Sequence, residues 1–298
     1  MAATVVVVAF HRAMEAERLV GLLRSPKIQL VLVNVDSDPV VAAAAHGADV
    51  VDLPGNPGYA AAINSAVARA RGDAVVFMND DVVVDSATVL EMTAALKRSG
   101  AAVVVPRVID AAGNTEGTIM ALPTPSALFR EWALLPDRPL AGLARWLRVE
   151  KWRRPTVPEP VEAATAAVVA ARRDVLVAHP LPEDYFLYWE EAEWFWRLRE
   201  AGLVVEFHPE CVASHRGGRD DIRPAKSELL ARNAVRCVRR TQGRGSATVA
   251  YLVVILWQLR LTATAVARRL TGRAAAPTEL RSRLAGLLAG IASLRELA

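Results

Sequence analysis

The sequence has few cysteines, and this removes several classes of protein from consideration. Cys211 and Cys237 are the only two in 298 residues, and neither belongs to a CxxC or CxxH pattern. Zinc fingers, dithiol redox sites and disulfide frameworks all depend on such patterns. We therefore expect both thiols to be buried or idle in a reducing cytoplasm.

The chain also has no long apolar run at its start. About six apolar residues precede His11 and Arg12, and no basic residue comes before them. The core of a signal peptide is longer and follows a basic segment. The run is better explained as a first buried strand.

Acidic residues are scarce in the last third of the chain. Residues 212–298 contain 16 Lys and Arg residues but only five Asp and Glu residues. Residues 1–211 contain 20 Lys and Arg residues and 27 Asp and Glu residues. This asymmetry indicates an anionic partner for the tail, which means nucleic acid, an anionic membrane surface or a phosphorylated substrate. Hydrophobic residues make up 53% of the chain and charged residues 23%, as is typical of an ordered globular protein.

Short β-branched runs alternate with stretches of helical period through the first hundred residues. This rhythm predicts an α/β fold with a mostly parallel sheet and helices on both faces. The expected strands are 5–10, 28–35, 48–53, 73–79 and 101–106, and the expected helices are 14–24, 39–46, 58–71 and 86–98. Ligands bind beyond the carboxyl ends of such strands, so residues 10–12, 36–38, 56–58 and 79–81 are candidates for a site.

Two acidic motifs could carry chemistry. Asp80 and Asp81 follow a predicted strand, where adjacent carboxylates can anchor a hard divalent cation and leave positions open for phosphate oxygens. Glu190, Glu191 and Glu193 begin a predicted helix that ends at Gly202, and the helix dipole there favours an ionised carboxylate. An ionised acid can act as general base towards an attacking hydroxyl, while a metal and cationic groups absorb charge on a departing diphosphate.

A histidine ends the strand-like run 205–215. An imidazole at a strand tip can complete a coordination sphere that carboxylates begin, so His215 is a third candidate, and the nearby glycines Gly217 and Gly218 would let a diphosphate approach the backbone. His208 is the weaker candidate. The cations that suit phosphate in this region are Arg216, Arg219, Arg223 and Lys226.

The C-terminal segments depart from the α/β pattern. Residues 226–242 place Arg232, Arg236, Arg239 and Arg240 on one helical face, and residues 246–267 contain a single charge, Arg260. Because that charge makes a full membrane span costly, we expect an interfacial helix or a packed helical hairpin, with a buried soluble helix as the alternative. The expected domains are therefore 1–225 and 226–298.

Residues 136–160 are rich in Pro and Arg and include Trp146 and Trp152. They predict an irregular or amphipathic excursion rather than part of the core. An acceptor-side flap, a membrane-contacting element and a solvated surface helix all agree with this composition.

In this order, the motifs resemble the inverting family 2 glycosyltransferases of GT-A fold, in particular the rhamnosyltransferase-like and galactofuranosyltransferase-like branch. The likeness covers residues 4 to about 242. It rests on VVVVAFHR, VNVDSDP, NPGYAAAIN, FMNDD, EDYFLYWEEAEWFWRL, SHRGG and the ARN at 231–233. It implies a Rossmann-like, mostly parallel sheet for a nucleotide-diphospho-sugar, with a C-terminal helical extension.

The resemblance also implies individual roles. Asp81, with Asp80 nearby and His215 as a further ligand, would hold Mg²⁺ or Mn²⁺ at the diphosphate. Glu191 would be the catalytic base, and Glu190 would shape the acceptor site beside it. The implied donor-binding residues are Phe10, Asn34, Asp36, Asn56, Gly58, Asn64 and Asp80.

The chain departs from the family pattern at two places. The family usually has Asp where Glu191 stands, and the extra methylene moves the basic oxygen by roughly 1.5 Å. The turn that contacts the nucleotide is shortened to VDSDP, so that Asn34, Asp36 and Asp38 compete for the contact with the base or ribose.

The expected function is transfer of a sugar, with inversion, from a UDP- or dTDP-linked donor to a polyprenyl-linked or other cell-envelope glycan acceptor. We expect a cytoplasmic protein peripheral to the inner face of the cell membrane, with homo-oligomerisation through the C-terminal helices as an additional expectation. Nucleic acid is not an expected partner, because no recognised binding module accompanies the arginines.

Two other functions remain open. A non-catalytic nucleotide-sugar or glycan-binding relative would have lost turnover through the change at Glu191. A sugar-nucleotide nucleotidylyltransferase would share the sheet and the diphosphate metal, but it usually has a glycine-rich phosphate loop after the first strand. The corresponding segment here, AFHRAMEAERL, has no glycine.

Overall fold

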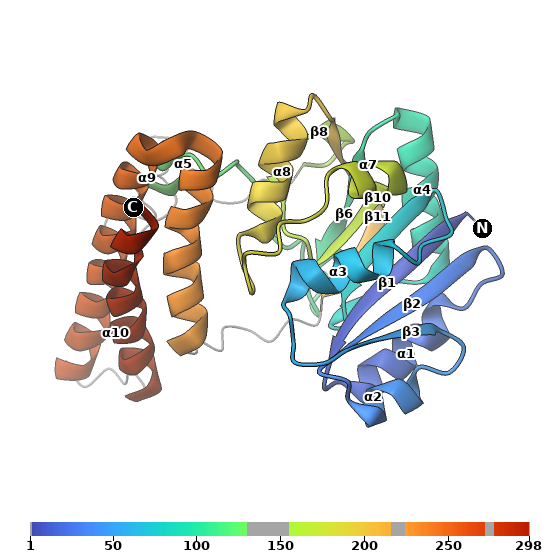
Figure 1. Ribbon diagram of the computed structural model, residues 1–298, viewed down its shortest axis with the longest axis horizontal. Helices are drawn as coiled ribbons and strands as arrows, with labels where there is room; N and C mark the ends of the chain where they lie inside the picture. Colours follow the sequence, from blue (N-terminus) through green and yellow to red (C-terminus); the bar gives the residue numbers. More distant parts are fainter. Residues whose placement is uncertain (1, 130–154, 216–223, 272–276, 298) are drawn as a thin grey trace. The chain divides into compact units, whose positions relative to one another are not determined.

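The structure is a computed structural model that describes residues 2–129, 155–215, 224–271 and 277–297. The described residues form two compact units, which are drawn in Figure 1. The first contains residues 2–120 and 155–215, and the second contains residues 121–129 and 224–297. Residues 121–129 thus join the second unit, which the expected boundary at residue 225 did not anticipate. Most of the expected flap at 136–160 and the cations Arg216, Arg219 and Arg223 lie outside the described residues.

A mixed, mostly parallel sheet forms the first unit. In the described part of the chain it has nine strands, in the order β3-β2-β1-β4-β10-β6-β11-β5 with β8 paired to β11. The strands are β1 (Ala3–Phe10), β2 (Ile28–Val35), β3 (Asp49–Leu53), β4 (Ala74–Asn79), β5 (Val82–Val83), β6 (Val103–Ile109), β8 (Glu159–Pro160), β10 (Val168–Arg172) and β11 (Val205–His215). A separate pair joins β7 (Ile119–Met120) to β9 (Ala163–Ala164).

The five strands expected in the first hundred residues are confirmed. β1 runs parallel to β2 and β4, and β2 runs parallel to β3, so their carboxyl ends share one edge of the sheet. All eight residues of β2 are buried, which explains its nearly continuous apolar sequence. The sequence did not predict β10, a short strand that lies antiparallel between β4 and β6.

Helices cover both faces of this sheet. The helices of the first unit are α1 (Ala13–Leu23), α2 (Pro39–Ala44), α3 (Tyr59–Val67), α4 (Ser86–Ser99), α7 (Arg173–Ala178) and α8 (Glu190–Glu200). Leu19 of α1 and Met92 of α4 share a core cluster with Val5 and Val7, which are two residues apart on β1. On the other face Trp194 of α8 packs edge-on against Phe77, with ring centroids 5.9 Å apart. The alternation along the strands therefore builds two hydrophobic layers.

The second unit is helical. It consists of α5 (Pro125–Leu128), α9 (Pro224–Leu270), α10 (Pro277–Ala292) and the 3₁₀ turn η2 (Ser293–Leu297). α10 packs along α9, and the Gln242 side chain of α9 donates a 2.7 Å hydrogen bond to the Pro123 carbonyl. The expected segments 226–242 and 246–267 form one helix with a break at Gly243, where φ is 83°.

The long helix α9 passes a membrane-span test by length and composition. Its residues 226–270 contain an 18-residue window with a mean hydropathy of 1.7, of which 28% is buried. Core helices of soluble proteins can pass the same test. Both cysteines are buried free thiols, as expected.

Candidate active site

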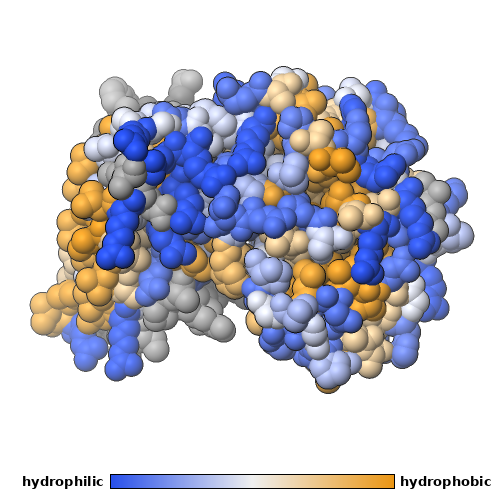
Figure 2. All heavy atoms as spheres, viewed as in Figure 1, coloured by the Kyte–Doolittle hydropathy of each residue, from blue (hydrophilic) through white to orange (hydrophobic). Residues whose placement is uncertain are grey.

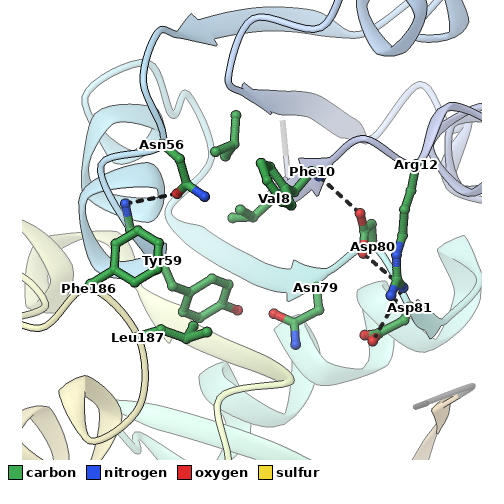
Figure 3. Close-up of a pocket in the computed structure, with 12 residues that line it drawn as sticks. Val8, Phe10, Arg12, Asn56, Tyr59, Asn79, Asp80, Asp81, Phe186 and Leu187 are labelled. Carbon is green, nitrogen blue, oxygen red and sulfur yellow. Dashed lines mark hydrogen bonds and ion pairs between the residues drawn. The ribbon is translucent and has the colours of Figure 1, made fainter. Parts of the chain in front are cut away.

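A cavity of about 460 Å³ opens at the carboxyl ends of the first unit's strands. Ligand sites of open α/β sheets are expected at this edge. Figure 3 shows side chains from β1, β4, the start of α3 and the segment before α8 turned towards it. The lining residues are Val8, Phe10, Arg12, Val35, Asn56, Gly58, Tyr59, Asn79, Asp80, Asp81, Phe186 and Leu187.

The backbone around this cavity adopts uncommon conformations. Every non-glycine residue with positive φ in the described chain follows β1, β2 or β3, or precedes α8: His11, Asp36, Ser37, Asn56, Tyr188 and Trp189. Such conformations cost free energy and persist where surrounding structure enforces them, which is frequent at ligand sites. Strain therefore marks the same edge of the sheet as the cavity.

Asp80 ties two strands together at the edge of the cavity. Its Oδ2 accepts a 3.1 Å hydrogen bond from the backbone N–H of Phe10, so the ends of β1 and β4 are joined. Burial raises the pKa of Asp80 to about 6. The Arg12 guanidinium lies 3.4 Å from Asp80 and 3.5 Å from Asp81. Phe10 is itself half exposed and lines the cavity.

Asp81 and His215 meet although they are far apart in the chain. His215 Nε2 lies 3.4 Å from Asp81 Oδ1 because β11 pairs with β5, which directly follows Asp81. Burial raises the pKa of Asp81, but the hydrogen bond and charge of His215 together with Arg12 outweigh it and lower that pKa overall. The hydrogen bond to Asp81 raises the pKa of His215.

Glu116 holds His215 from the opposite side. Its Oε2 lies 3.1 Å from His215 Nδ1. A neutral imidazole that donates Nδ1–H to this carboxylate has its Nε2 lone pair free for a cation. The backbone N–H of Glu116 bonds to the Val108 carbonyl, which anchors the carboxylate to β6.

Asp81 and His215 fit a divalent cation. Asp81 Oδ1 is buried, and His215 Nε2 at 3.4 Å is the neighbouring group that faces it. Mg²⁺ and Mn²⁺ at nucleotide sites use one or two protein ligands and take their remaining oxygens from phosphate and water. No cluster of three or more metal-ligating side chains occurs within the described residues, so these residues would supply only part of a coordination sphere.

The second acidic pair begins α8. Glu190 is buried and Glu191 is partly buried, and one carboxylate oxygen of each has no hydrogen-bond partner in the described structure. Burial and the neighbouring Glu191 raise the pKa of Glu190 to about 9, and burial also raises the pKa of Glu191. Burial thus opposes the helix dipole, which was expected to favour the ionised form of these acids.

Tyr59 lies in the wall of the cavity. Its hydroxyl donates a 2.8 Å hydrogen bond to the Ala166 carbonyl. Burial raises the pKa of Tyr59, and Glu190, Glu191, Asp81 and Asp80 all raise it further through their charges. Both pairs therefore act electrostatically on one side chain of the cavity wall, although Glu190 and Glu191 are not among the lining residues.

Glu193, the third acid of this motif, has a structural task. It is 1% exposed and accepts hydrogen bonds from the Tyr185 hydroxyl, at 2.5 Å, and from Arg197. With both oxygens bonded, it fastens the start of α8 to the segment before it.

The candidates in the shortened turn after β2 separate clearly. Asn34 is fully buried, and its amide bonds to Asp38 and Asp52. Its expected donor contact is not supported, because those bonds occupy the amide. Asp38 caps α2 by accepting from the Val40 N–H. Asp36 is half exposed and next to the lining residue Val35, so it remains the candidate for the base or ribose.

The NPGY turn supports the cavity in two ways. Asn56 lines it and accepts a hydrogen bond from the Gly58 N–H, and Gly58 has φ 98° and lies against the Phe186 carbonyl. Asn64 differs from the expectation of a donor contact, because its amide bonds to Leu181 and Glu183. It holds the segment before α8 on α3.

Several residues of the site were not assigned a role from the sequence. Arg12 and Asn79 lie at strand ends, which was the signal for these two, and Tyr59 lies in the NPGY motif at the start of α3. Phe186 lies in the aromatic stretch before α8. No sequence pattern indicated a role for Glu116, since it lies in a loop without a recognisable motif. His208, the weaker histidine candidate, is buried between Glu206 and Glu210.

Solved structures share this fold. The crystal structure of GalNAc-T7 with UDP, GalNAc and Mn²⁺ aligns with a TM-score of 0.58 at 17% identity, over 80% of this chain and 48% of that one. This chain thus spans about half the length of that protein. Glucosyl-3-phosphoglycerate synthase from Mycobacterium tuberculosis, in complex with Mn²⁺, UDP and glucosyl-3-phosphoglycerate, aligns with a TM-score of 0.53 at 20% identity. The alignment covers 81% of this chain and 80% of that one. S. aureus TarS 1–349 aligns with a TM-score of 0.51 at 12% identity, over 98% of this chain and 81% of that one.

The fold is that of the GT-A nucleotide-sugar transferases. Residues 4–146 match the sequence model described as Glycosyl transferase family 2. Curated protein sequences give no significant match. The rhamnosyltransferase-like and galactofuranosyltransferase-like branch remains a prediction.

Proposed function

We propose that the protein transfers a sugar from a UDP- or dTDP-linked donor, with inversion, to a hydroxyl of a polyprenyl-linked or other cell-envelope glycan. The observation that carries this proposal is the meeting of Asp81 and His215 at the edge of the cavity that Asp81 lines. Mn²⁺ and UDP are present in the GalNAc-T7 and glucosyl-3-phosphoglycerate synthase structures. They support a similar donor complex here.

Each element of the site would have a separate task. Asp81 and His215 would hold a Mg²⁺ or Mn²⁺ ion, which stabilises negative charge on the departing diphosphate. Asp36 and Asn56 would bind the nucleoside and its sugar. Glu191 would take the proton from the acceptor hydroxyl, and Glu190 would orient that hydroxyl.

Ligand-linked stabilisation tests the donor part of the proposal. A ligand that binds only the folded state raises the melting temperature, and the stabilisation grows with the ratio of its concentration to Kd. We expect UDP- or dTDP-sugars to raise it in the presence of Mn²⁺ and not in its absence, and Asp81→Asn to remove the effect. If no nucleotide sugar stabilises the wild-type protein with either cation, the donor assignment is wrong.

The second candidate function is binding of a nucleotide sugar or glycan without catalysis. The raised pKa values of Glu190 and Glu191 favour it. A protonated acid cannot act as a general base, so a binding protein would keep donor affinity without transfer. Product formation from the stabilising nucleotide sugar should fall by about 10²-fold or more in Glu191→Gln if the residue is the base. Equal background in both proteins would identify a binder.

We further propose that the second unit associates with the inner face of the cytoplasmic membrane. Large apolar side chains are exposed on α9 at Val249, Leu252, Leu256 and Leu259, a helical spacing that puts them on one stripe. Leu284, Leu288 and Ile291 repeat the pattern on α10. Figure 2 shows apolar surface over this unit, with hydrophilic side chains beside it.

The surplus of cations in this unit suits an anionic membrane surface. Vesicle flotation tests directly whether the second unit binds a membrane surface. We expect the wild-type protein to float with anionic vesicles and Leu252→Gln/Leu256→Gln to float far less. Val40→Gln/Val177→Gln is the matched control, since those residues are 63% and 65% exposed on the first unit. A stripe variant that dissociates a homo-oligomer but floats normally would assign the stripe to a subunit interface instead.

A further inference from the structure

We propose that Arg12 competes with the divalent cation for Asp80 and Asp81, and that it transfers to the donor diphosphate when the cation binds. The inference rests on the proposed donor site. It makes Arg12 a diphosphate-binding residue that couples cation binding to nucleotide binding, so that neither ligand is held strongly without the other.

The geometry places one guanidinium nitrogen between the two carboxylates. Arg12 Nη1 lies 3.4 Å from Asp80 Oδ1 and 3.5 Å from Asp81 Oδ2. Figure 3 shows the side chain reaching from the end of β1 to both acids at one rim of the cavity. A cation that ligates Asp81 takes the attraction of that carboxylate away from Arg12.

Arg12 can move without disturbing the fold. Its side chain is 49% exposed, and it makes no side-chain cap to α1. The carboxylates, in contrast, are fixed. Asp80 accepts a hydrogen bond from the Phe10 backbone, and Asp81 faces His215. Exchange therefore requires only a rotation of the long arginine side chain.

The displaced guanidinium has a suitable second partner. Arg12 lines the cavity in which a donor diphosphate would lie beside the cation. Guanidinium is always charged, and its planar fork binds phosphate oxygens in pairs. Arg12 thus opposes a cation that arrives alone and favours a cation that arrives with a diphosphate. This is a thermodynamic coupling between two ligands.

A purely structural ion pair would behave differently. If Arg12 only held Asp80 and Asp81 in place, its removal would disorder the carboxylates and weaken the binding of Mn²⁺, with or without UDP. Competition predicts that removal of Arg12 strengthens the binding of Mn²⁺ alone and weakens the binding of UDP in the presence of Mn²⁺. A loss of structure would weaken both.

Titration calorimetry at one fixed pH measures both affinities. For Arg12→Met we expect Mn²⁺ alone to bind about tenfold more tightly than to the wild type, and UDP in the presence of Mn²⁺ to bind about tenfold more weakly, within the usual range of such couplings. Arg12→Lys keeps the charge without the fork. It should retain weak Mn²⁺ binding and lose UDP affinity.

Arg71→Met is the matched control, because Arg71 pairs with Asp49 at 3.6 Å outside the cavity. It should leave both affinities unchanged. Unchanged or weaker Mn²⁺ binding by Arg12→Met, at an unchanged melting temperature, would overturn the competition. Tighter Mn²⁺ binding with no UDP binding by any variant would confirm the competition at the acids and reject the donor site.

Discussion

At the residue scale, the site depends on carboxylates that burial keeps in different states. The pKa of Asp81 is lowered by His215 and Arg12, whereas burial dominates at Glu190 and Glu191 and raises their pKa values. The lowered pKa of Asp81 thus favours a carboxylate that can bind a cation, whereas burial favours the protonated forms of Glu190 and Glu191. Opposite shifts in neighbouring acids are the pattern from which distinct chemical roles arise.

Glu190 predicts a stability that depends on pH. Its pKa rises from 4.5 in the unfolded chain to about 9 in the folded protein, so the folded state binds more protons between those values. The folded protein is therefore stabilised fully below pH 4.5, and this contribution is lost as the pH rises towards 9. Glu190→Gln should raise the melting temperature more at pH 8.5 than at pH 5, as scanning fluorimetry would measure. An equal change at both pH values would contradict the raised pKa.

Glu116 predicts an effect on metal affinity without a direct contact to the metal. Glu116→Gln weakens the hold on His215 Nδ1, so Mn²⁺ affinity measured in the presence of UDP should fall by about 10- to 100-fold. Glu210→Gln is the control, because Glu210 makes the equivalent contact to His208, away from the cavity. Unchanged Mn²⁺ affinity in Glu116→Gln would show that β11 alone orients His215.

At the scale of elements, the cavity depends on a close contact between the start of α3 and the segment before α8. The Tyr59 N–H bonds to the Phe186 carbonyl at 3.3 Å, and the Asn64 amide bonds to Leu181 and Glu183. Tyr188 and Trp189 then turn with positive φ into Glu190. Packing on α3 therefore places the acids of α8, and the strain of the turn is part of that placement.

Gly58 allows this contact, and its replacement should break it. A Cβ at Gly58 would lie 2.4 Å from the Phe186 carbonyl oxygen, and φ is 98°. Gly58→Ala should lower the free energy of unfolding by about 2 kcal/mol or more and remove stabilisation by nucleotide sugars. Gly55→Ala has a similar φ of 73° but nothing within 4 Å, so chemical denaturation should show a smaller loss and normal nucleotide binding. Equal losses in the two variants would refute a role for the contact.

Gln258 predicts that the second unit can be stabilised by one substitution. The side chain is 1% exposed and lies against Gly286, and its amide has no hydrogen-bond partner among the described residues. A buried polar group without a partner costs about 1–3 kcal/mol. Gln258→Leu should therefore raise the denaturation midpoint, whereas Gln242→Leu, which loses a hydrogen bond to Pro123, should lower it. A destabilised Gln258→Leu protein would reveal a partner for the amide.

At the scale of the whole molecule, the acidic and basic parts of the chain correspond to the two proposed tasks, donor binding and membrane association. The acidic first 211 residues contain all residues of the proposed donor site except His215, and the basic residues 212–298 form most of a helical unit with exposed apolar stripes. Screening weakens the attraction between cations and anionic lipid, whereas apolar burial persists in salt. Vesicle binding in 0.5 M NaCl should therefore be reduced but measurable, and neutral vesicles should show little dependence on salt. Binding that salt abolishes entirely would exclude a role for the apolar stripes.

The sequence was sufficient for the main strands and helices, because each has a distinct periodicity and polar residues at its ends. It was not sufficient for β10, whose five residues VVAAR carry no alternating pattern and become a strand only between β4 and β6. The motif residues Asp80, Asp81 and His215 could be selected from composition and strand-end position. The different tasks of Asn34, Asp36 and Asp38 could not, since burial and hydrogen bonding separate three residues that look equivalent in the sequence.

The sequence by itself determined the α/β architecture and the edge of the sheet at which the cavity lies, because these depend on local periodicity and on the order of strands and helices. Only the tertiary structure decided which side chains meet. It brought His215 to Asp81 through the pairing of β11 with β5, placed Glu116 behind His215 and Arg12 between the two aspartates, and buried Glu190. Protonation and contact depend on neighbours distant in the chain, and a linear pattern carries no information about their distances.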